Sequence, residues 1–410
     1  MMNIIWGGMF LVAIITAIFK LIFFQDLKIF GLLTNAIFQN AKISVDISLG
    51  LIGILCFWLG ILELVEKNGI AQKISHKLYP FFKVIMKDIP KDSPAISSIV
   101  LNMSANFLGL DNAATPIGIR AMEQLQEHNK DKTQASDAQI LFMLINSSSV
   151  CFIPITIFMY RAQMGAIFPT DVFIPILLAT SISTLVAFLS IAVKQHIDLT
   201  NVIIRKMLFY FILFIMVICC GFSLINHENR LVISSFLGNV ILILAIGYII
   251  YVSIKSKIKC YDVFIDGAKN GFNVAIKIIP YLVSMLVAIG VFRASGFLDF
   301  VLQCFRELCE IYSIDNTFVD VLPTAFIKPL SGSGARAMMI ETMNNFGANS
   351  LQGFMASVIQ GSTETTFYVI AVYFGAVKIS NTRYALKYGL WADLAGIISA
   401  IIISYLFYGN

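Results

Sequence analysis

Four polar segments interrupt a chain that is otherwise apolar enough for a membrane, and they carry the side chains that could do chemistry. The segments form two pairs, in which 101–116 corresponds to 327–336 and 146–149 corresponds to 360–366. Paired interruptions of this kind are typical of a binding site between two repeats, because their side chains and free backbone groups can hold an ion or a polar solute. We therefore predict a site that contains Asn102, Asn106, Asp111, Asn112, Thr115, Ser147, Ser148, Ser331, Ser333, Arg336, Ser362, Thr363, Glu364, Thr365 and Asp393.

Charged residues within apolar sequence are the strongest candidates for function, because a charge at membrane depth is costly and is usually functional. Glu364 lies inside a polar segment and is the first candidate to bind a coupling proton or cation. Asp393 is either a second carboxylate of the site or a structural partner of Lys277. Lys328 and Arg336 could contact an anionic group of the solute or extend to the membrane surface.

The asparagines and serines also permit a purely structural interpretation. In membrane helices such side chains often hydrogen-bond one helix to the next, at about 0.6 kcal/mol each. Their concentration in four paired segments favours a binding site for the set as a whole.

Motifs of enzymes and metal sites are missing from the sequence. There is no GxSxG, HExxH or Walker motif, the seven cysteines include no CxxC pair, and the four histidines fall in predicted loops. Basic and aromatic residues do not alternate as they do in nucleic-acid-binding proteins. We expect a protein that is not an enzyme, has no metal site and no cofactor, and uses Na⁺ or H⁺ as its coupling ion.

The composition places these segments in a polytopic membrane protein. Hydrophobic residues make up 58% of the chain and charged residues 13%, against about 25% charged residues in soluble proteins. We expect the first apolar run to be a retained helix, because no basic region precedes it and no cleavage site follows. The sequence predicts spans at about 3–24, 43–65, 136–160, 169–193, 207–225, 231–254, 271–293, 350–376 and 384–407.

The lysines and arginines predict how the chain crosses the membrane. The stretches 93–120 and 318–341 are too short for two crossings, which need about 40 residues. If each is a re-entrant hairpin, most flanking basic residues fall on one side, whereas single crossings divide them almost evenly; the positive-inside rule favours the hairpins. The N-terminus then lies on the inner, cytoplasmic side of the bacterial cytoplasmic (inner) membrane, and the C-terminus lies on the outer side. Residues 71–87 form a predicted amphipathic helix on the inner surface.

These elements predict an all-α polytopic membrane protein with two inverted-topology repeats, each with a re-entrant helical hairpin and a broken transmembrane helix. The first repeat comprises residues 1–206 and the second residues 231–410, and a transmembrane helix within 207–230 connects them. This architecture is common in secondary transporters and places their binding sites near the bilayer midplane.

The same residues carry a resemblance to known families. The first half resembles spore maturation protein A and the second half spore maturation protein B, so the chain is similar to a natural fusion of the two. Both families belong to the nucleoside recognition (Gate) domain superfamily, shared with concentrative nucleoside transporters and the membrane domain of ferrous iron transporter B. Lys328 departs from the family pattern, where arginine is expected. The matching motifs occupy 3–6, 57–60, 106–116 and 121–124 in the first half, and 279–283, 291–296, 328–332, 360–366 and 388–393 in the second.

We therefore predict a secondary active transporter or exchanger of a small polar, in some cases anionic, solute. Its partners are that solute and the lipid bilayer, without nucleic acid, and a homodimer is compatible with the architecture. One alternative is a non-transporting membrane scaffold or sensor with a cytoplasmic partner, and another is a metal-ion permease, for which only Met103 and Cys151 lie near the breaks.

Overall fold

The computed structural model describes residues 2–86, 89–90, 93–107 and 111–408, without the side chains of 2–3, 71–73, 75, 111–113 and 227–228. Within the described residues the chain is helical, and its only strand-like pairing is a single bridge between Gln134 and Asn381. The helices are α1 (Met2–Phe24), α2 (Ile29–Asn68), α3 (Ile70–Ile85), α4 (Pro94–Phe107), α5 (Asp111–His128), α6 (Asp137–Ser147), α7 (Ile155–Gln163), α8 (Phe173–Lys194), α9 (Val202–Ser223), α10 (His227–Lys255), α11 (Cys260–Ala294), α12 (Phe297–Ile311), the 3₁₀ helix η1 (Thr317–Val321), α13 (Leu322–Ile327), α14 (Gly332–Phe346), α15 (Leu351–Gly361), α16 (Thr366–Ala376) and α17 (Ala385–Tyr408).

Seven helices in the described part of the chain are long and apolar enough to cross a membrane, which confirms an all-α polytopic membrane protein. They are α1, α2, α8, α9, α10, α11 and α17. The two remaining predicted spans, 136–160 and 350–376, are each interrupted: α6 and α7 share the first, and α15 and α16 share the second. The chain therefore has helix breaks at the two positions where the sequence places polar residues inside apolar runs.

Each of the predicted hairpin stretches forms two helices. In the first, α4 and α5 are held together by Asn102, whose side-chain nitrogen donates a hydrogen bond to the Ala114 carbonyl at 2.6 Å. In the second, α13 ends at Ile327, and Ser331 caps the start of α14 by accepting a hydrogen bond from the Gly334 amide at 3.0 Å. We call these pairs hairpin 1 (α4 and α5) and hairpin 2 (α13 and α14).

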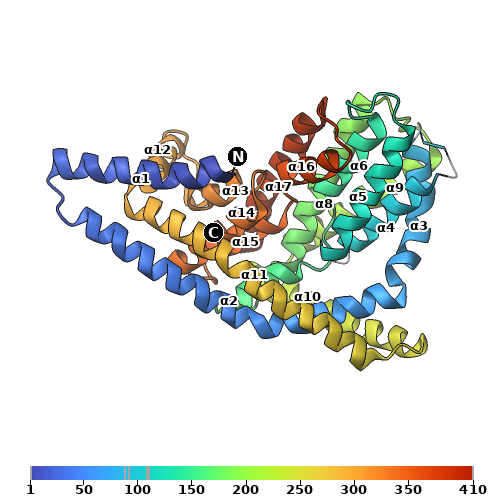
Figure 1. Cartoon of the computed structure of the whole chain (residues 1–410), viewed down its shortest axis with the longest axis horizontal. Helices are drawn as coiled ribbons and strands as arrows, with labels where there is room; N and C mark the ends of the chain where they lie inside the picture. Colours follow the sequence, from blue (N-terminus) through green and yellow to red (C-terminus); the bar gives the residue numbers. More distant parts are fainter. Residues whose placement is uncertain (1, 87–88, 91–92, 108–110, 409–410) are drawn as a thin grey trace.

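Helices α2 and α11 are longer than the predicted spans that they contain. With 40 and 35 residues, they extend about 60 Å and 50 Å, against about 30 Å of hydrocarbon in a bilayer. They lie side by side and run diagonally across the molecule, while α3 to α6, α8, α9 and α16 gather toward the right of the view (Figure 1). Helix α1 folds back along α11, and the Trp6 indole donates a hydrogen bond to the Ser284 carbonyl at 3.0 Å.

Small residues allow α2 and α11 to approach closely. A Cβ atom on Gly271 would lie 2.6 Å from the Cα of Cys56, and one on Gly267 would lie 2.5 Å from the Leu59 carbonyl oxygen. Glycines four residues apart on one helix face are a common means of packing membrane helices, because the backbones come into van der Waals contact. The crossing of the two long helices therefore depends on the absence of side chains at these positions.

Helix α3 confirms the helix predicted at 71–87. The sequence placed this helix on the membrane surface, but part of it is buried in the protein. Phe82 and Ile85 are buried in an apolar core, where α3 packs against α4 and α9. Lys77, in the middle of the helix, is exposed. By contrast, α9 and α10 expose most of their apolar side chains, which suits helices that face lipid.

We expect Gly271→Leu to destabilise the protein by about 1–3 kcal/mol, because the added side chain would overlap the α2 backbone. The measurement is the thermal unfolding of the purified protein in detergent. Gly53→Leu is the control, since Gly53 lies on α2 with no atom near its missing side chain. Equal melting temperatures for the two variants would contradict the close crossing.

Candidate functional site

The four polar segments meet in space through their backbones. We define break 1 as residues 148–154, between α6 and α7, and break 2 as residues 362–365, between α15 and α16. The Glu364 amide of break 2 donates to the carbonyl of Ser147, next to break 1, at 2.8 Å. Each break region also bonds to a hairpin, since the Phe152 amide donates to Phe107 at 3.4 Å and the Phe367 amide to Pro329 at 3.1 Å.

Local sequence explains where the broken helices end. The Ser148 hydroxyl donates to the Leu144 carbonyl at 2.9 Å, and the Ser362 hydroxyl donates to the Ile359 carbonyl at 2.8 Å. Each hydroxyl thereby adds a second hydrogen bond to a carbonyl in the last turn of its helix, which already accepts one from the backbone amide of the same serine. Pro154, at the end of break 1, has no amide hydrogen to donate. Thr184 of α8 donates its hydroxyl hydrogen to the Ser148 carbonyl, so a neighbouring helix also supports the break.

Asp393 of α17 lies against break 2 and is 1% exposed. Gly389 and Gly396, one turn before and after it, leave room for the break. A Cβ atom on Gly389 would lie 2.6 Å from the methyl carbon of Thr366, and one on Gly396 would overlap the methyl carbon of Thr363. The spacing of two glycines around the aspartate therefore brings the threonines of break 2 and α16 beside its carboxylate.

The oxygens of this cluster are buried and poorly satisfied. Neither carboxylate oxygen of Asp393 and neither hydroxyl of Thr363 and Thr366 forms a regular hydrogen bond with the described residues. The two hydroxyls nevertheless lie close enough to interact with the carboxylate, as does Lys328 of hairpin 2. Lys328 is itself buried, and its positive charge interacts with the Asp393 carboxylate. Lys277, the partner offered by the sequence, is exposed on α11.

Glu364 differs from Asp393 in its surroundings. Its side chain is exposed, although it lies near enough to Asp393 and Tyr373 for an electrostatic interaction. The sequence ranks Glu364 first because it lies within a polar segment. In the structure, Asp393 and not Glu364 is the carboxylate removed from solvent. Its charge therefore depends more strongly on neighbouring groups.

A second buried polar cluster joins α4, α6 and α16. The Asn146 side-chain nitrogen donates to the Asn102 side-chain oxygen at 2.6 Å and to the Tyr373 hydroxyl at 2.8 Å. Asn102 also donates to the Tyr373 hydroxyl, at 3.3 Å. The Asn102 side chain is 0% exposed and bonds to Ala114, Tyr373 and Asn146, so it connects the helices around it. Asn146 begins the polar run 146–149, but no local pattern distinguishes Tyr373 within its apolar helix.

The remaining predicted residues of hairpin 1 and break 1 differ in burial and in hydrogen bonding. Asn106 and Thr115 are half-buried, and the Asn106 side-chain nitrogen has no hydrogen-bond partner among the described residues. Asp111 and Asn112 begin α5, and their side chains lie outside the described residues. Ser147 is buried and, like Ser148, donates its hydroxyl hydrogen to the Leu144 carbonyl. Both serine side chains therefore hydrogen-bond within the last turn of α6.

In hairpin 2, the predicted residues lie around the start of α14. The Ser331 and Ser333 hydroxyls are 3.2 Å apart, and Ser333 is exposed. The Arg336 guanidinium lies over the Tyr160 ring, 5.4 Å from its centroid. Thr365 is buried beside Gly332, where a Cβ atom would lie 2.9 Å from its hydroxyl oxygen. Hairpin 2 and break 2 thus contribute Lys328, the serines and the threonines to one region.

The sequence did not indicate a buried ion pair that supports the broken helices from another side. Arg161 of α7 is 0% exposed, and its guanidinium nitrogen lies 2.9 Å from a carboxylate oxygen of Asp171. The same guanidinium donates to the Ala348 carbonyl at 3.1 Å and to the Ser357 hydroxyl of α15 at 3.3 Å. Arg161 therefore links α7 to α15, the helices adjoining breaks 1 and 2.

We expect Tyr373→Phe to lower the free energy of unfolding by about 1–2 kcal/mol, because the amides of Asn102 and Asn146 lose their shared acceptor. Tyr368→Phe is a matched control, since Tyr368 is on the same helix and is 58% exposed. The measurement is unfolding in detergent followed by tryptophan fluorescence. If both variants unfold like the original protein, the amide cluster does not stabilise the breaks.

Comparison with known proteins finds two relatives, each similar to part of the chain. The chain is 45% identical to spore maturation protein B of Bacillus subtilis (strain 168) over 168 residues, which cover 41% of the chain and 92% of that protein. It is 38% identical to spore maturation protein A of the same organism over 183 residues, which cover 45% of the chain and 90% of that protein. No solved structure matches.

The family match falls on the residues that form the two hairpins and the two breaks. The model of the Gate family, described as nucleoside recognition, matches residues 48–167 and 275–380. The first segment contains hairpin 1 and break 1, and the second contains hairpin 2 and break 2. Since the two segments together make up more than half of the sequence, the chain belongs to the Gate (nucleoside recognition) family.

Proposed function

We propose that this protein is a secondary active transporter or exchanger of a small polar solute in the bacterial cytoplasmic membrane. The observation that carries the proposal is the buried carboxylate of Asp393, which adjoins break 2 without a regular hydrogen bond to the described residues. A carboxylate in such a place is costly unless its charge is balanced by a cation or removed by a proton. The site is therefore suited to bind and release one of these ions.

The proposal includes two inverted repeats with re-entrant hairpins, with the N-terminus inside and the C-terminus outside. Equivalent backbone contacts support it, because Phe107 accepts a hydrogen bond from break 1 and Pro329 accepts one from the start of α16, after break 2. Broken helices at the contact between two repeats are a recurring site for substrate and coupling ions near the membrane midplane. Break 1 and break 2 would form that contact here.

Coupling would arise from the interaction of Asp393 with Lys328. While the aspartate is charged, its attraction for Lys328 holds hairpin 2 against α17. Binding of Na⁺ or H⁺ at the carboxylate would remove that attraction and free the hairpin to move. Movement of hairpin 2 relative to the breaks would then expose the solute site to one side of the membrane or the other.

The solute class follows from the residues near the breaks. Hydroxyls and amides predominate there, with Arg336 over Tyr160 as a nearby cation and aromatic ring. Such groups suit a polar molecule with hydrogen-bonding groups and a ring that can stack. The description of the Gate family as nucleoside recognition makes nucleosides and nucleobases the first compounds to test.

The test is uptake of radiolabelled nucleosides and nucleobases into proteoliposomes under an imposed Na⁺ or H⁺ gradient. We expect Asp393→Asn to reduce gradient-driven uptake at least tenfold while the protein remains folded, because the neutral side chain cannot change its charge. Asp266→Asn is the control, since Asp266 is exposed on α11 and pairs with nearby Lys269.

Two results would change the assignment. Normal uptake in Asp393→Asn, with uptake lost in Glu364→Gln, would return the coupling role to Glu364. A folded protein that takes up none of these compounds under either gradient would support a non-transporting scaffold or sensor.

A further inference from the structure

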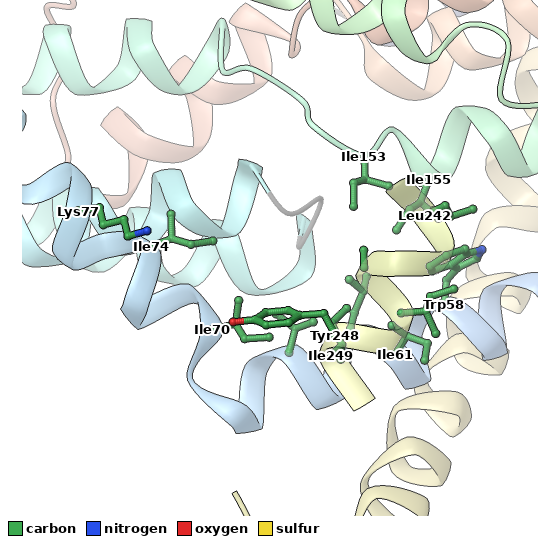
Figure 2. Close-up of a pocket in the computed structure, with 14 residues that line it drawn as sticks. Trp58, Ile61, Ile70, Ile74, Lys77, Ile153, Ile155, Leu242, Tyr248 and Ile249 are labelled. Carbon is green, nitrogen blue, oxygen red and sulfur yellow. The ribbon is translucent and has the colours of Figure 1, made fainter. Parts of the chain in front are cut away.

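An apolar cavity of about 270 Å³ lies between α2, α3, α10 and the residues around the end of break 1. Figure 2 shows Trp58, Leu242, Ile153 and Ile155 at one end, and Lys77 at the other. The cavity is separate from the cluster around Asp393, whose residues are not part of its lining. The proposed transport activity assigns it no role.

The lining has the chemistry of an amphiphile site. Among the described residues that line it, Lys77 is charged and the others are aliphatic or aromatic. An apolar cavity of this size does not hold water well, because its walls offer few hydrogen bonds, and it can accept an apolar ligand. The ammonium of Lys77 is exposed and favours an anionic group beside the apolar chain.

The cavity is placed where a ligand could enter from the bilayer. Tyr248 of α10 lines it and is also 54% exposed. Ile243, Leu244 and Tyr251 on the same helix are exposed apolar or aromatic side chains, which suits a helix surrounded by lipid. Tyrosine and lysine at the edge of an apolar region are typical of the membrane interface, where headgroups lie.

We propose that this cavity holds an acyl chain of an anionic membrane phospholipid, with the lipid phosphate near Lys77. The chain packs against Trp58, Ile61 and Ile70, and its far end reaches Ile153 and Ile155. Ile153 belongs to break 1, and Ile155 is the first residue of α7. The bound lipid thereby supports the interrupted backbone from the membrane side.

The test is a titration of delipidated protein in detergent with phosphatidylglycerol or with phosphatidylcholine of the same acyl chains, followed by thermal unfolding. We expect both lipids to raise the melting temperature, and phosphatidylglycerol to bind about fivefold more tightly, as one lysine near an anionic headgroup contributes about 1 kcal/mol. Lys77→Gln should abolish this preference. Lys255→Gln, which alters an exposed lysine of α10 outside the cavity, should retain it.

A second pair of variants tests the cavity itself. Ala245→Phe fills the space and should remove the effect of both lipids, whereas Ile243→Phe, on the exposed face of the same helix, should not. Equal binding of the two lipids by the original protein would overturn the proposal. So would an unchanged preference in Lys77→Gln, a result that does not depend on the folding of Ala245→Phe. None of these readouts requires transport, so the proposal can fail independently of the proposed function.

Discussion

Backbone groups released by an interrupted helix must find new hydrogen-bond partners when no water is available, and this requirement governs the centre of the molecule. Break 1 and break 2 meet it largely with each other and with the hairpins, through the Glu364 amide and the carbonyls of Phe107 and Pro329. Serine hydroxyls add second hydrogen bonds to carbonyls in the last turns of α6 and α15, beside those from the serine amides. Because each interruption supplies partners for another, none of them could be straightened without leaving polar groups of its neighbours unsatisfied.

The same region tolerates a buried charge. Asp393 interacts with Lys328, and the glycines at 389 and 396 bring threonine hydroxyls to its side. Neither carboxylate oxygen forms a regular hydrogen bond with the described residues, and the charge of Lys328 offsets that of the aspartate. Such an arrangement is easier to rearrange than a fully bonded network such as Asn102, Asn146 and Tyr373.

Much of the helical plan was predictable, since long apolar runs and polar interruptions are local properties of the sequence. The breaks at Ser148 and Ser362 are examples, because hydroxyl and small residues disturb a run of apolar ones. The full length of α2 was not predictable from hydropathy, as the helix continues through Lys42 and Asp46 before its apolar part. Pairs such as Lys328 with Asp393, or Asn146 with Tyr373, join distant parts of the chain, and only the tertiary fold decides them. The choice between Glu364 and Asp393 likewise depended on burial, which composition cannot give. The extent of the repeats and the orientation of the termini remain predictions.

Because α2 and α11 are long, a small change in their direction would move their ends over a large distance. Gly271 packs against Cys56, and the start of α2 at Ile29 lies 27 residues away along the helix, or about 40 Å. A stiff rod that turns by about 10° at this crossing would carry its far end, with α1 attached, through about 7 Å. If the packed pair turned as one body at this point, it would act as a lever, in which a small rotation near Gly271 becomes a large displacement at the start of α2.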